Sequence, residues 1–390
     1  LYQDEEVMQK LQHAKDAGKP IDGHAPGLLG EQAHQYIDAG ISTDHECYTY
    51  EEAKHKLDHG MKILIREGSA AKNYLALSPL FDYRPDRLMF CSDDKHPDDL
   101  IEGHINLLVR RAISDGYDLY DVLRAACINP IDHYDLGVGQ LRVGDAADFV
   151  IVEDLKNFNV ISTYINGTQV SDSTHCLFSK VTAVPINQFN CTTKQAKDFE
   201  IQTNANHARV IHALDGEIIT KELITHITTE KGRLLADTKR DILTITVINR
   251  YEDAPPVSAL IHGFGLSHGA IASCVGHDTH NIIAVGCDTN SLAKAVNIII
   301  ENRGGISAVG NDREIFLPLP FAGIMSGDEG SLVGKQYAEL DRFTKDVLGS
   351  CLGAPYMTLS FMALLVIPDL KLSDKGLFSG KEFRFVDSFI

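Results

Sequence analysis

The sequence lacks the features that would place it in a membrane or in an oxidising compartment. No apolar stretch approaches the roughly 20 residues that span a bilayer, and the first six residues, Leu1 to Glu6, form neither a basic nor an apolar leader region. The eight cysteines show no Cys-x-x-Cys spacing, and several lie in apolar runs where a thiol acts as a small hydrophobic group. These absences predict a reduced, cytoplasmic protein with no membrane partner.

Basic residues are also scarce. The 390 residues include 36 Lys and Arg against 54 Asp and Glu, so the formal net charge is −18. Such a surface repels phosphate backbones, which argues against a nucleic-acid partner. Neither a GxGxxG nor a GxxxxGK[ST] motif occurs, so nucleoside triphosphates are not indicated. The length suggests two or three domains.

Metal-competent side chains do occur, directly after three short apolar runs. They are His24 in Asp-Gly-His-Ala-Pro, His45 in Thr-Asp-His-Glu, and Asp93 in Phe-Cys-Ser-Asp-Asp. Each position is one where a β-strand would end, and a (β/α) barrel builds its active site from the carboxyl ends of its parallel strands. Two imidazoles and a carboxylate suit a catalytic zinc, manganese or iron ion.

Strand and helix patterns alternate through residues 1–127. Strands are predicted at 20–24, 41–43, 61–65 and 87–91, and helices at 31–39, 50–59 and 69–77, followed by two helical segments between 97 and 126. Repeated β-α units imply a parallel sheet. About four units are present, whereas a closed barrel needs eight. We therefore expect either a chain that begins in the middle of a barrel or an open sheet.

The pattern changes after about residue 129. Turn glycines separate short apolar strands between 136 and 152, and an Asn-Gly turn at 166–167 predicts a hairpin, so this region is a small β-module. The polar stretch 187–197 is predicted to be a linker. Residues 198–390 contain predicted strands at 242–248 and 281–285 and a helix at 291–303, which indicates a separate α+β domain.

Ordered motifs in all three regions resemble those of the adenine deaminase family within the metal-dependent amidohydrolase superfamily. Besides the three boxes above, they include Gly-Gln-Leu-Arg-Val-Gly-Asp-Ala-Ala-Asp at 139–148, Gly-Ala-Ile-Ala-Ser at 269–273 and His-Asp-Thr-His-Asn-Ile-Ile at 277–283. The resemblance covers nearly the whole chain. It implies the second half of a (β/α)₈ amidohydrolase barrel at 1–128, a small β-sandwich module at 129–186 and the family's C-terminal α+β domain at 198–390.

The resemblance also implies a reaction and a site. The reaction is hydrolytic deamination of adenine to hypoxanthine and ammonia, a step of purine salvage, with one or two divalent ions of Mn, Fe or Zn. His24 would be the ligand from the fifth barrel strand, His45 the ligand from the sixth, and Asp93 the carboxylate after the eighth. Asp93 would also shuttle the proton of the attacking water, while Glu46 or Asp94 would face the purine.

Two elements of the family pattern are missing from this sequence, and a further property follows from resemblance alone. The His-x-His pair and the bridging carboxylate of the barrel's first half are absent. We therefore expect any bound metal to be weakly or partly ligated unless the missing N-terminal half of the barrel is supplied. Acidic family enzymes of this size commonly self-associate, which predicts a homo-oligomer.

Each site residue has a structural alternative. A single His after a strand is usually a satisfied polar residue, but three metal-competent residues on successive β-α units favour ligation. Asp93 and Asp94 could instead cap the helix that follows Pro97. His277 and His280 could lie in a polar hairpin turn, or their loop could reach the barrel mouth and bind the purine.

One further histidine pair fits a metal site by spacing alone. His55 and His59 lie one helical turn apart, the spacing of a helical metal pair. They lie opposite the apolar stripe of Ala53 and Leu57, so a solvated helix face is favoured.

Two other functions remain open. The barrel ligands would look similar in another cyclic-amide amidohydrolase, although residues 277–281 argue against it. The missing His-x-His pair would support an inactive fragment or a metal-poor binding protein.

Overall fold

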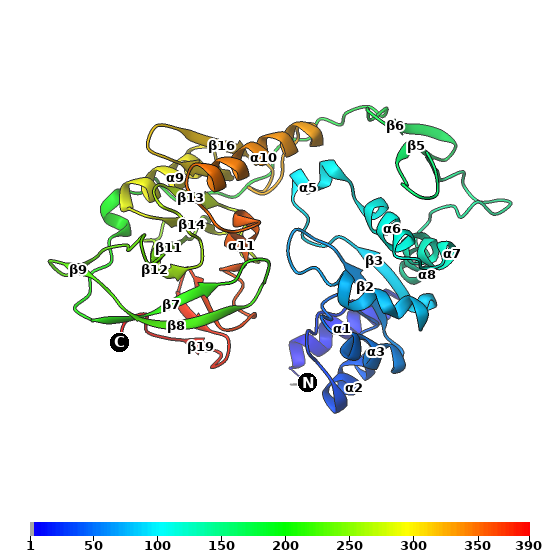
Figure 1. Ribbon diagram of the computed structural model, residues 1–390, viewed down its shortest axis with the longest axis horizontal. Helices are drawn as coiled ribbons and strands as arrows, with labels where there is room; N and C mark the ends of the chain where they lie inside the picture. Colours follow the sequence, from blue (N-terminus) through cyan, green and yellow to red (C-terminus); the bar gives the residue numbers. More distant parts are fainter. Residues whose placement is uncertain (1–3) are drawn as a thin grey trace. The chain divides into compact units, whose positions relative to one another are not determined.

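The computed structural model describes residues 4–390, which form two compact units (Figure 1). The first unit contains the chain up to residue 95 together with 102–181, and the second contains 96–101 together with 182–390. The expectation about a leader rests partly on Leu1 to Gln3, which lie outside the described residues. None of the helices formed by residues 4–390 has the length and apolar character needed to cross a bilayer.

The first unit begins with alternating helices and strands. Its elements up to the third strand are α1 (Glu5–Asp16), α2 (Gly30–Asp38), β1 (Thr43–Asp44), α3 (Tyr50–Asp58), β2 (Lys62–Arg66), α4 (Tyr74–Leu77), the 3₁₀ turns at Ser78–Asp82 and Pro85–Arg87, and β3 (Leu88–Cys91). After β3 the first unit continues with α6 (Ile105–Ser114), α7 (Leu119–Leu123), a π-helical turn (Arg124–Ile128) and α8 (Asn129–Tyr134), while the intervening α5 (Pro97–Glu102) belongs almost entirely to the second unit.

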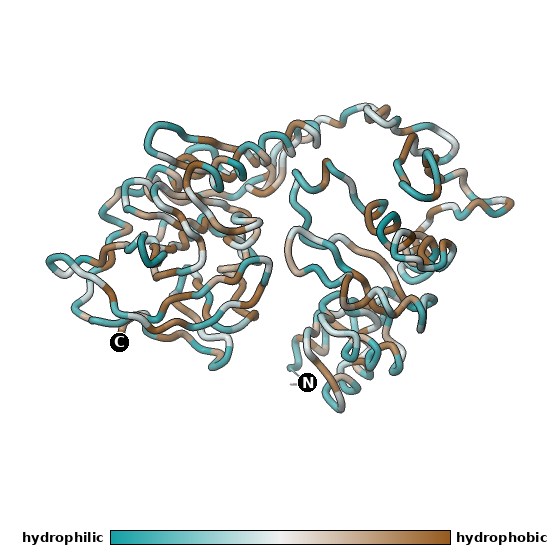
Figure 2. The backbone as a smooth tube through the Cα atoms, in the orientation of Figure 1, coloured by the Kyte–Doolittle hydropathy of each residue, from teal (hydrophilic) through white to brown (hydrophobic). Residues whose placement is uncertain are grey.

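Strands β1, β2 and β3 form a parallel sheet in that order, as the β-α pattern predicted. Ile63 and Ile65 of β2 and Leu88 and Phe90 of β3 are buried in one hydrophobic cluster with residues of α6 and α7. Figure 2 shows hydrophobic residues concentrated on β2 and around α6 and α7. Because strands of a parallel sheet all point the same way, the residues that follow β1, β2 and β3 meet at one edge.

Two predicted elements differ from the structure. Residues 20–24 form no strand, and three of the five, Pro20, Asp22 and Gly23, are of residue types that are depleted in strands. This segment is tied to the next by the bond from the Ser42 amide to the Ile21 carbonyl (2.9 Å). The helix predicted at 69–77 forms only over α4, so the residues before Tyr74 are left as a loop. The other predicted strands of 1–127 and the helices at 31–39 and 50–59 are present with ends shifted by a few residues. The two helical segments predicted between 97 and 126 are three helices and the start of a π-helical turn, and α1 was not predicted.

The small β-module is a three-stranded antiparallel sheet. It consists of β4 (Phe149–Val152), β5 (Val160–Ile165) and β6 (Thr168–Asp172). Ile165 pairs with Thr168 across the Asn166-Gly167 turn, which confirms the predicted hairpin. The glycine-rich segment 136–148 before it forms turns and irregular structure instead of the expected short strands.

The second unit is built on a large mixed sheet. Its order is β16-β15-β13-β14-β11-β12-β7-β8, with neighbours antiparallel except for β12 and β7. The strands are β7 (His207–Ala213), β8 (Thr220–His226), β11 (Leu243–Ile248), β12 (Val257–His262), β13 (Ala270–Ser273), β14 (Ile282–Gly286), β15 (Gly305–Val309) and β16 (Glu314–Pro318). The remaining elements are a 3₁₀ turn (Ala196–Phe199), β9 (Thr229–Glu230), β10 (Arg233–Leu234), α9 (Thr289–Glu301), α10 (Gly330–Asp346), α11 (Pro355–Phe361), β17 (Leu370–Ser373), β18 (Gly376–Ser379) and β19 (Arg384–Phe385).

Helix α9 packs its apolar face on this sheet. Leu292, Val296 and Ile299 are fully buried against residues of β11, β13 and β14. Phe189 and Cys191 are buried in the same cluster. The prediction of a linker at 187–197 is therefore wrong: the stretch reads as polar, but its few apolar side chains pack into the core of the second unit.

Lys371 on β17 is a buried cation without a carboxylate partner among its hydrogen bonds. Its ammonium group donates to the Ile218 carbonyl (2.7 Å), and desolvation by burial lowers its pKa from 10.5 to about 7. The unfolded chain therefore holds more protons than the folded protein between pH 7 and pH 10.5. Burial of Lys371 therefore lowers the free energy of unfolding at neutral pH, and this penalty disappears as the pH rises from 7 to 10.5.

Replacing Lys371 with methionine is expected to raise the free energy of unfolding at pH 7 by about 2 kcal/mol. The lowered pKa corresponds to a cost of about 4 kcal/mol at that pH, and the lost hydrogen bond offsets roughly half of it. Urea denaturation at pH 7, 8.5 and 10 checks this, because the advantage of K371M over the native chain should shrink with rising pH. The exposed Lys375 gives the control K375M, which should behave like the native chain. A K371M advantage that is absent at pH 7, or equal at every pH, would contradict the assignment.

Candidate metal centre

The loop that carries His24 lies against the start of β1. The Gly23 amide donates to the Thr43 hydroxyl (3.3 Å), which itself donates to Asp22 (2.7 Å). A Cβ atom at Gly23 would lie 2.1 Å from the Thr43 carbonyl oxygen, so glycine is required for this close approach. The Tyr36 hydroxyl accepts from the His24 amide (3.0 Å). These contacts place His24, which is about half exposed, beside the end of β1.

His45 follows β1 directly, and the residue before it is held inside the protein. The Asp44 carboxylate is fully buried and accepts from the Lys56 ammonium (2.6 Å) and from the Glu46 amide (2.8 Å). The Asn73 side chain donates to the His45 carbonyl (3.3 Å). The backbone on both sides of His45 is therefore fixed by hydrogen bonds.

Lys56 of α3 links the two histidine loops. Its fully buried ammonium group donates to Asp44, to Glu52 (2.7 Å) and to the carbonyl of Ala25 (2.7 Å), the residue after His24. Desolvation lowers the pKa of Lys56, but the neighbouring groups, with Cys47 and Asp44 first among them, outweigh it and leave the pKa raised. Lys56 thus stays protonated and binds both loops at once.

Asp93 lies in the loop after β3 in a left-handed backbone conformation, with φ of 50°. Asp tolerates this conformation better than most residues do, because its short polar side chain can hydrogen-bond locally. The loops after β2 and β3 are joined by the bond from the Ser69 amide to the Asp94 carbonyl (2.8 Å). A Cβ atom at Gly68 would lie 2.7 Å from that same carbonyl oxygen, so glycine permits the contact.

The structure brings His24, His45, Glu46, Asp93 and Asp94 together at the carboxyl ends of the parallel strands. His45 Nε2 lies 3.2 Å from an Asp93 carboxylate oxygen and 3.5 Å from Glu46 Oε1. His24 Nδ1 lies 3.6 Å from the same Glu46 oxygen. The predicted site residues of the first unit thus form one cluster.

Arg66, the last residue of β2, binds all three carboxylates of this cluster. One guanidinium nitrogen contacts Glu46 and lies 3.0 Å from Asp93, and the other lies 3.3 Å from Asp94. Arg66 and Glu46 are both buried. Burial raises the pKa of Glu46, while Arg66 and His45 act in the opposite direction. The guanidinium offsets the repulsion among three acidic groups held close together.

The donor set fits a divalent metal ion. A ligand nitrogen of His24, one of His45 and an oxygen of Glu46 all lie within 4.8 Å of one another. Metal bonds of about 2.0–2.2 Å in a tetrahedral arrangement place neighbouring donors about 3.3 Å apart. The two histidine–Glu46 separations are 3.6 and 3.5 Å, and the His45–Asp93 separation is 3.2 Å. The carboxylate in the group of three is Glu46, which also contacts Arg66, and not Asp93, the ligand predicted from the sequence. Imidazole and carboxylate together suit Zn, Fe and Mn.

Lys56 and Arg66 were missed by the reasoning from sequence. Lys56 belongs to the same helical face as Ala53 and Leu57, so its charge at a core-facing position was an available signal. Arg66 directly follows the apolar run 61–65 and is the last residue of β2, whereas His45 is the first residue after β1. The sequence therefore showed a cation at the end of a predicted strand, but a search for metal ligands does not consider cations.

His277 and His280 lie in the second unit, in the loop between β13 and β14. These strands pair antiparallel, which confirms the hairpin interpretation of the segment. The His277 ring stacks on Phe361 (centroid separation 5.0 Å), and burial lowers the pKa of His280. A role in binding the purine stays a prediction.

Comparison with known proteins agrees with the two-part organisation. Residues 2–170 match the amidohydrolase family, and residues 217–384 match the adenine deaminase C-terminal domain. An adenine deaminase of Sulfurovum sp. is 55% identical over 385 residues, covering 99% of this chain and 71% of that protein. The chain belongs to the adenine deaminase family.

Other members of the adenine deaminase family match over the same extent. The adenine deaminase of Salinibacter ruber is 50% identical, covering 98% of this chain and 70% of its own length. That of Borreliella burgdorferi is 48% identical over 99% of this chain and 72% of its own length. Among solved structures, a beta-aspartyl dipeptidase of Fervidobacterium islandicum matches at 16% identity over 44% of this chain and 53% of its own, with a TM-score of 0.34, a likeness too weak to define the fold.

Proposed function

We propose that this member of the adenine deaminase family hydrolyses adenine to hypoxanthine and ammonia at the centre formed by His24, His45 and Asp93. The observation that carries the proposal is the convergence of these residues with Glu46 and Asp94 at one edge of the parallel sheet, in a chain 55% identical to an adenine deaminase. Imidazole and carboxylate donors at these separations support one or two ions of Mn, Fe or Zn.

His24 and His45 would hold the ion through the nitrogens that face Glu46, and Asp93 would hold it through the oxygen near His45. When bound, a divalent ion would lower the pKa of a water molecule to about 7, so that hydroxide would be available at neutral pH. Asp93 accepts the proton of the attacking water and passes it to the departing ammonia, because its carboxylate would lie beside both the ion and the water. Glu46 and Asp94 face the ring nitrogens of the purine, and Arg66 keeps both carboxylates in position.

We further propose that β1, β2 and β3 are part of a (β/α)₈ barrel, with a small β-sandwich module at 129–186 and the family's C-terminal domain at 198–390. The parallel order of the strands and the cluster at their carboxyl ends support this. The His-x-His pair and bridging carboxylate implied by the resemblance are not among the 390 residues. We propose that the complete centre draws further ligands from sequence outside this chain, so that the ion is held weakly without them.

The cellular setting follows from the sequence and remains a proposal. All eight cysteines, which lie within the described part of the chain, are free thiols. This supports a reducing compartment such as the cytoplasm, where adenine would enter purine salvage. A homo-oligomer stays a prediction from the resemblance.

The function is tested by measuring ammonia release from adenine after loading with Mn²⁺, Fe²⁺ or Zn²⁺, with and without the preceding segment of a longer relative. Adenine is expected to be turned over by at least one metal-loaded form, and more rapidly with the added segment. A panel containing adenosine, cytosine and cyclic amides provides the comparison. Turnover of a cyclic amide in preference to adenine would replace the proposed substrate. Metal binding without any turnover in either form would indicate a binding protein.

A further inference from the structure

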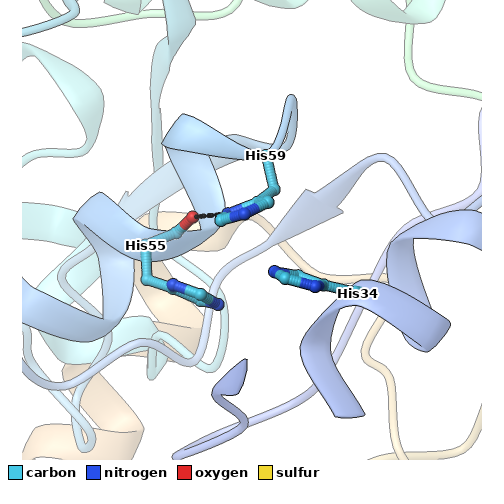
Figure 3. Close-up of side chains that lie close together, drawn as sticks. All are labelled: His34, His55 and His59. Atoms are coloured by element: carbon cyan, nitrogen blue, oxygen red, sulfur yellow. Dashed lines mark hydrogen bonds between the residues drawn. The ribbon is translucent and has the colours of Figure 1, made fainter. Parts of the chain in front are cut away.

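Three histidines gather in the first unit outside the centre described above. Figure 3 shows His55 of α3 and His59, the residue that follows this helix, with His34 of α2 facing them. The ring centroid of His34 lies 4.0 Å from that of His59 and 5.4 Å from that of His55, and the His55 and His59 centroids are 4.5 Å apart. The solvated helix face expected for His55 and His59 is therefore covered in part by a third imidazole.

We propose that His34, His55 and His59 bind a divalent transition-metal ion of the zinc or nickel type. One ligand nitrogen from each ring lies within 4.8 Å of the other two. A bound zinc ion requires neighbouring nitrogens about 3.3 Å apart, so the rings would have to move closer together when the ion binds. Three imidazoles from two helices are a donor set that zinc, nickel and copper accept.

The hydrogen bonds of His59 and His34 leave a ring nitrogen of each available for an ion. His59 Nδ1 lies 2.7 Å from the His55 carbonyl. A carbonyl only accepts, so Nδ1 carries the hydrogen and the lone pair is on Nε2. His34 Nδ1 lies 3.9 Å from the Glu31 carboxylate, and its Nε2 is buried without a hydrogen bond. A buried nitrogen with no partner is costly, and a metal ion would satisfy it.

His55 is the ring whose lone pair is already used. Its Nε2 accepts from the Gly30 amide over 3.2 Å, a long hydrogen bond that an ion can replace. Desolvation, followed by the proximity of His59 and His34, lowers the pKa of His55. The ring is therefore neutral at physiological pH, which is the form that ligates metals.

The proposed ion would fasten α2 to α3. Helix α2 follows the loop of His24, and α3 follows the loop of His45, so the two helices flank the segments that supply the catalytic histidines. An ion that binds the folded state alone stabilises it in proportion to the logarithm of its concentration over its Kd. The bound ion would therefore stabilise the positions of these two loops without contacting the substrate.

The test is zinc binding to the full chain after removal of metals with EDTA. Zinc per chain and its Kd are measured by titration and elemental analysis for the native chain, H59A and H34Q. H13A removes an exposed histidine on α1 and is the matched control. Both H59A and H34Q should bind about one zinc ion fewer, or bind it at least about tenfold more weakly, while H13A should match the native chain.

Zinc bound at the catalytic centre is distinguished from zinc bound by His34, His55 and His59 by repeating the measurement with H45A, which removes a proposed ligand of the catalytic centre. H45A/H59A should bind less zinc than H45A alone, and zinc should raise the melting temperature of H45A more than that of H45A/H59A. Circular dichroism of the metal-free forms establishes that H59A, an exposed substitution, and H34Q are folded. Zinc binding that is unchanged in both H59A and H34Q would overturn the proposal, and a loss confined to H59A would exclude His34 as a ligand.

Discussion

Asparagine at position 93 is expected to lower kcat for ammonia release from adenine by about 10²- to 10⁴-fold, the range that a general acid–base group contributes. The amide has nearly the same shape as the carboxylate but cannot accept the proton of the attacking water. Asp93 also lies 3.2 Å from His45 and 3.0 Å from Arg66. The lost charge should therefore weaken metal retention as well, which elemental analysis of the purified variant would show.

The matched control is D86N, which makes the same change at an exposed aspartate paired with Arg84 (3.0 Å). It should keep both kcat and metal content. D93N and the native enzyme are compared at saturating metal, so that an effect on proton transfer is distinguished from an effect on metal affinity. A native kcat in D93N would show that Asp93 takes no part in the mechanism. A kcat that is low but recovers fully at high metal concentration would show that Asp93 acts only as a metal ligand.

Replacing Lys56 with methionine is expected to destabilise the first unit by about 3–5 kcal/mol, the cost of removing one partner of a buried ion pair. The side chains of Lys56, Asp44 and Glu52 are between 0% and 3% exposed, so the carboxylates left behind cannot be solvated. The bond to the Ala25 carbonyl is lost too. Urea denaturation followed by circular dichroism measures the effect.

Lys54 provides the control on the same helix. Its pair with Asp58 is 2.7 Å long but more than one third exposed, so K54M should cost at most about 1 kcal/mol. The double variant K56M/D44N should be more stable than K56M, because it removes one of the uncompensated charges. K56M/D44N could instead be less stable than K56M by as much as D44N alone destabilises the native chain. The destabilisation by K56M would then come from lost packing and not from an uncompensated charge.

His24, His45 and Asp93 could be predicted from local patterns. His45 and Asp93 follow strands, and in a parallel sheet the carboxyl ends of the strands meet at one edge, so separated positions in sequence become neighbours. The segment before His24 forms no strand, and His24 is placed instead by the hydrogen bonds of the Gly23 amide to Thr43 and of its own amide to Tyr36. The structure confirms that they come together, along with Glu46 and Asp94.

The errors also have local causes. The segment 20–24 contains Pro20, Asp22 and Gly23, residue types that are depleted in strands, and it forms a loop where a strand was predicted. The stretch 187–197 is polar on average, yet Phe189 and Cys191 are enough to anchor it in the core. Average composition does not show where two side chains are buried.

The sequence by itself determined the family, the order of the β-α units and the positions of the candidate ligands, because these depend on periodicity and on residue types at short spacing. Only the tertiary structure decided which charges surround them. Lys56 reaches residues 31 and 12 positions earlier in the chain, and Arg66 gathers carboxylates from two different loops. His34 meets His55 and His59 through the packing of two helices. Such contacts depend on how distant segments fold against one another, so no local pattern specifies them.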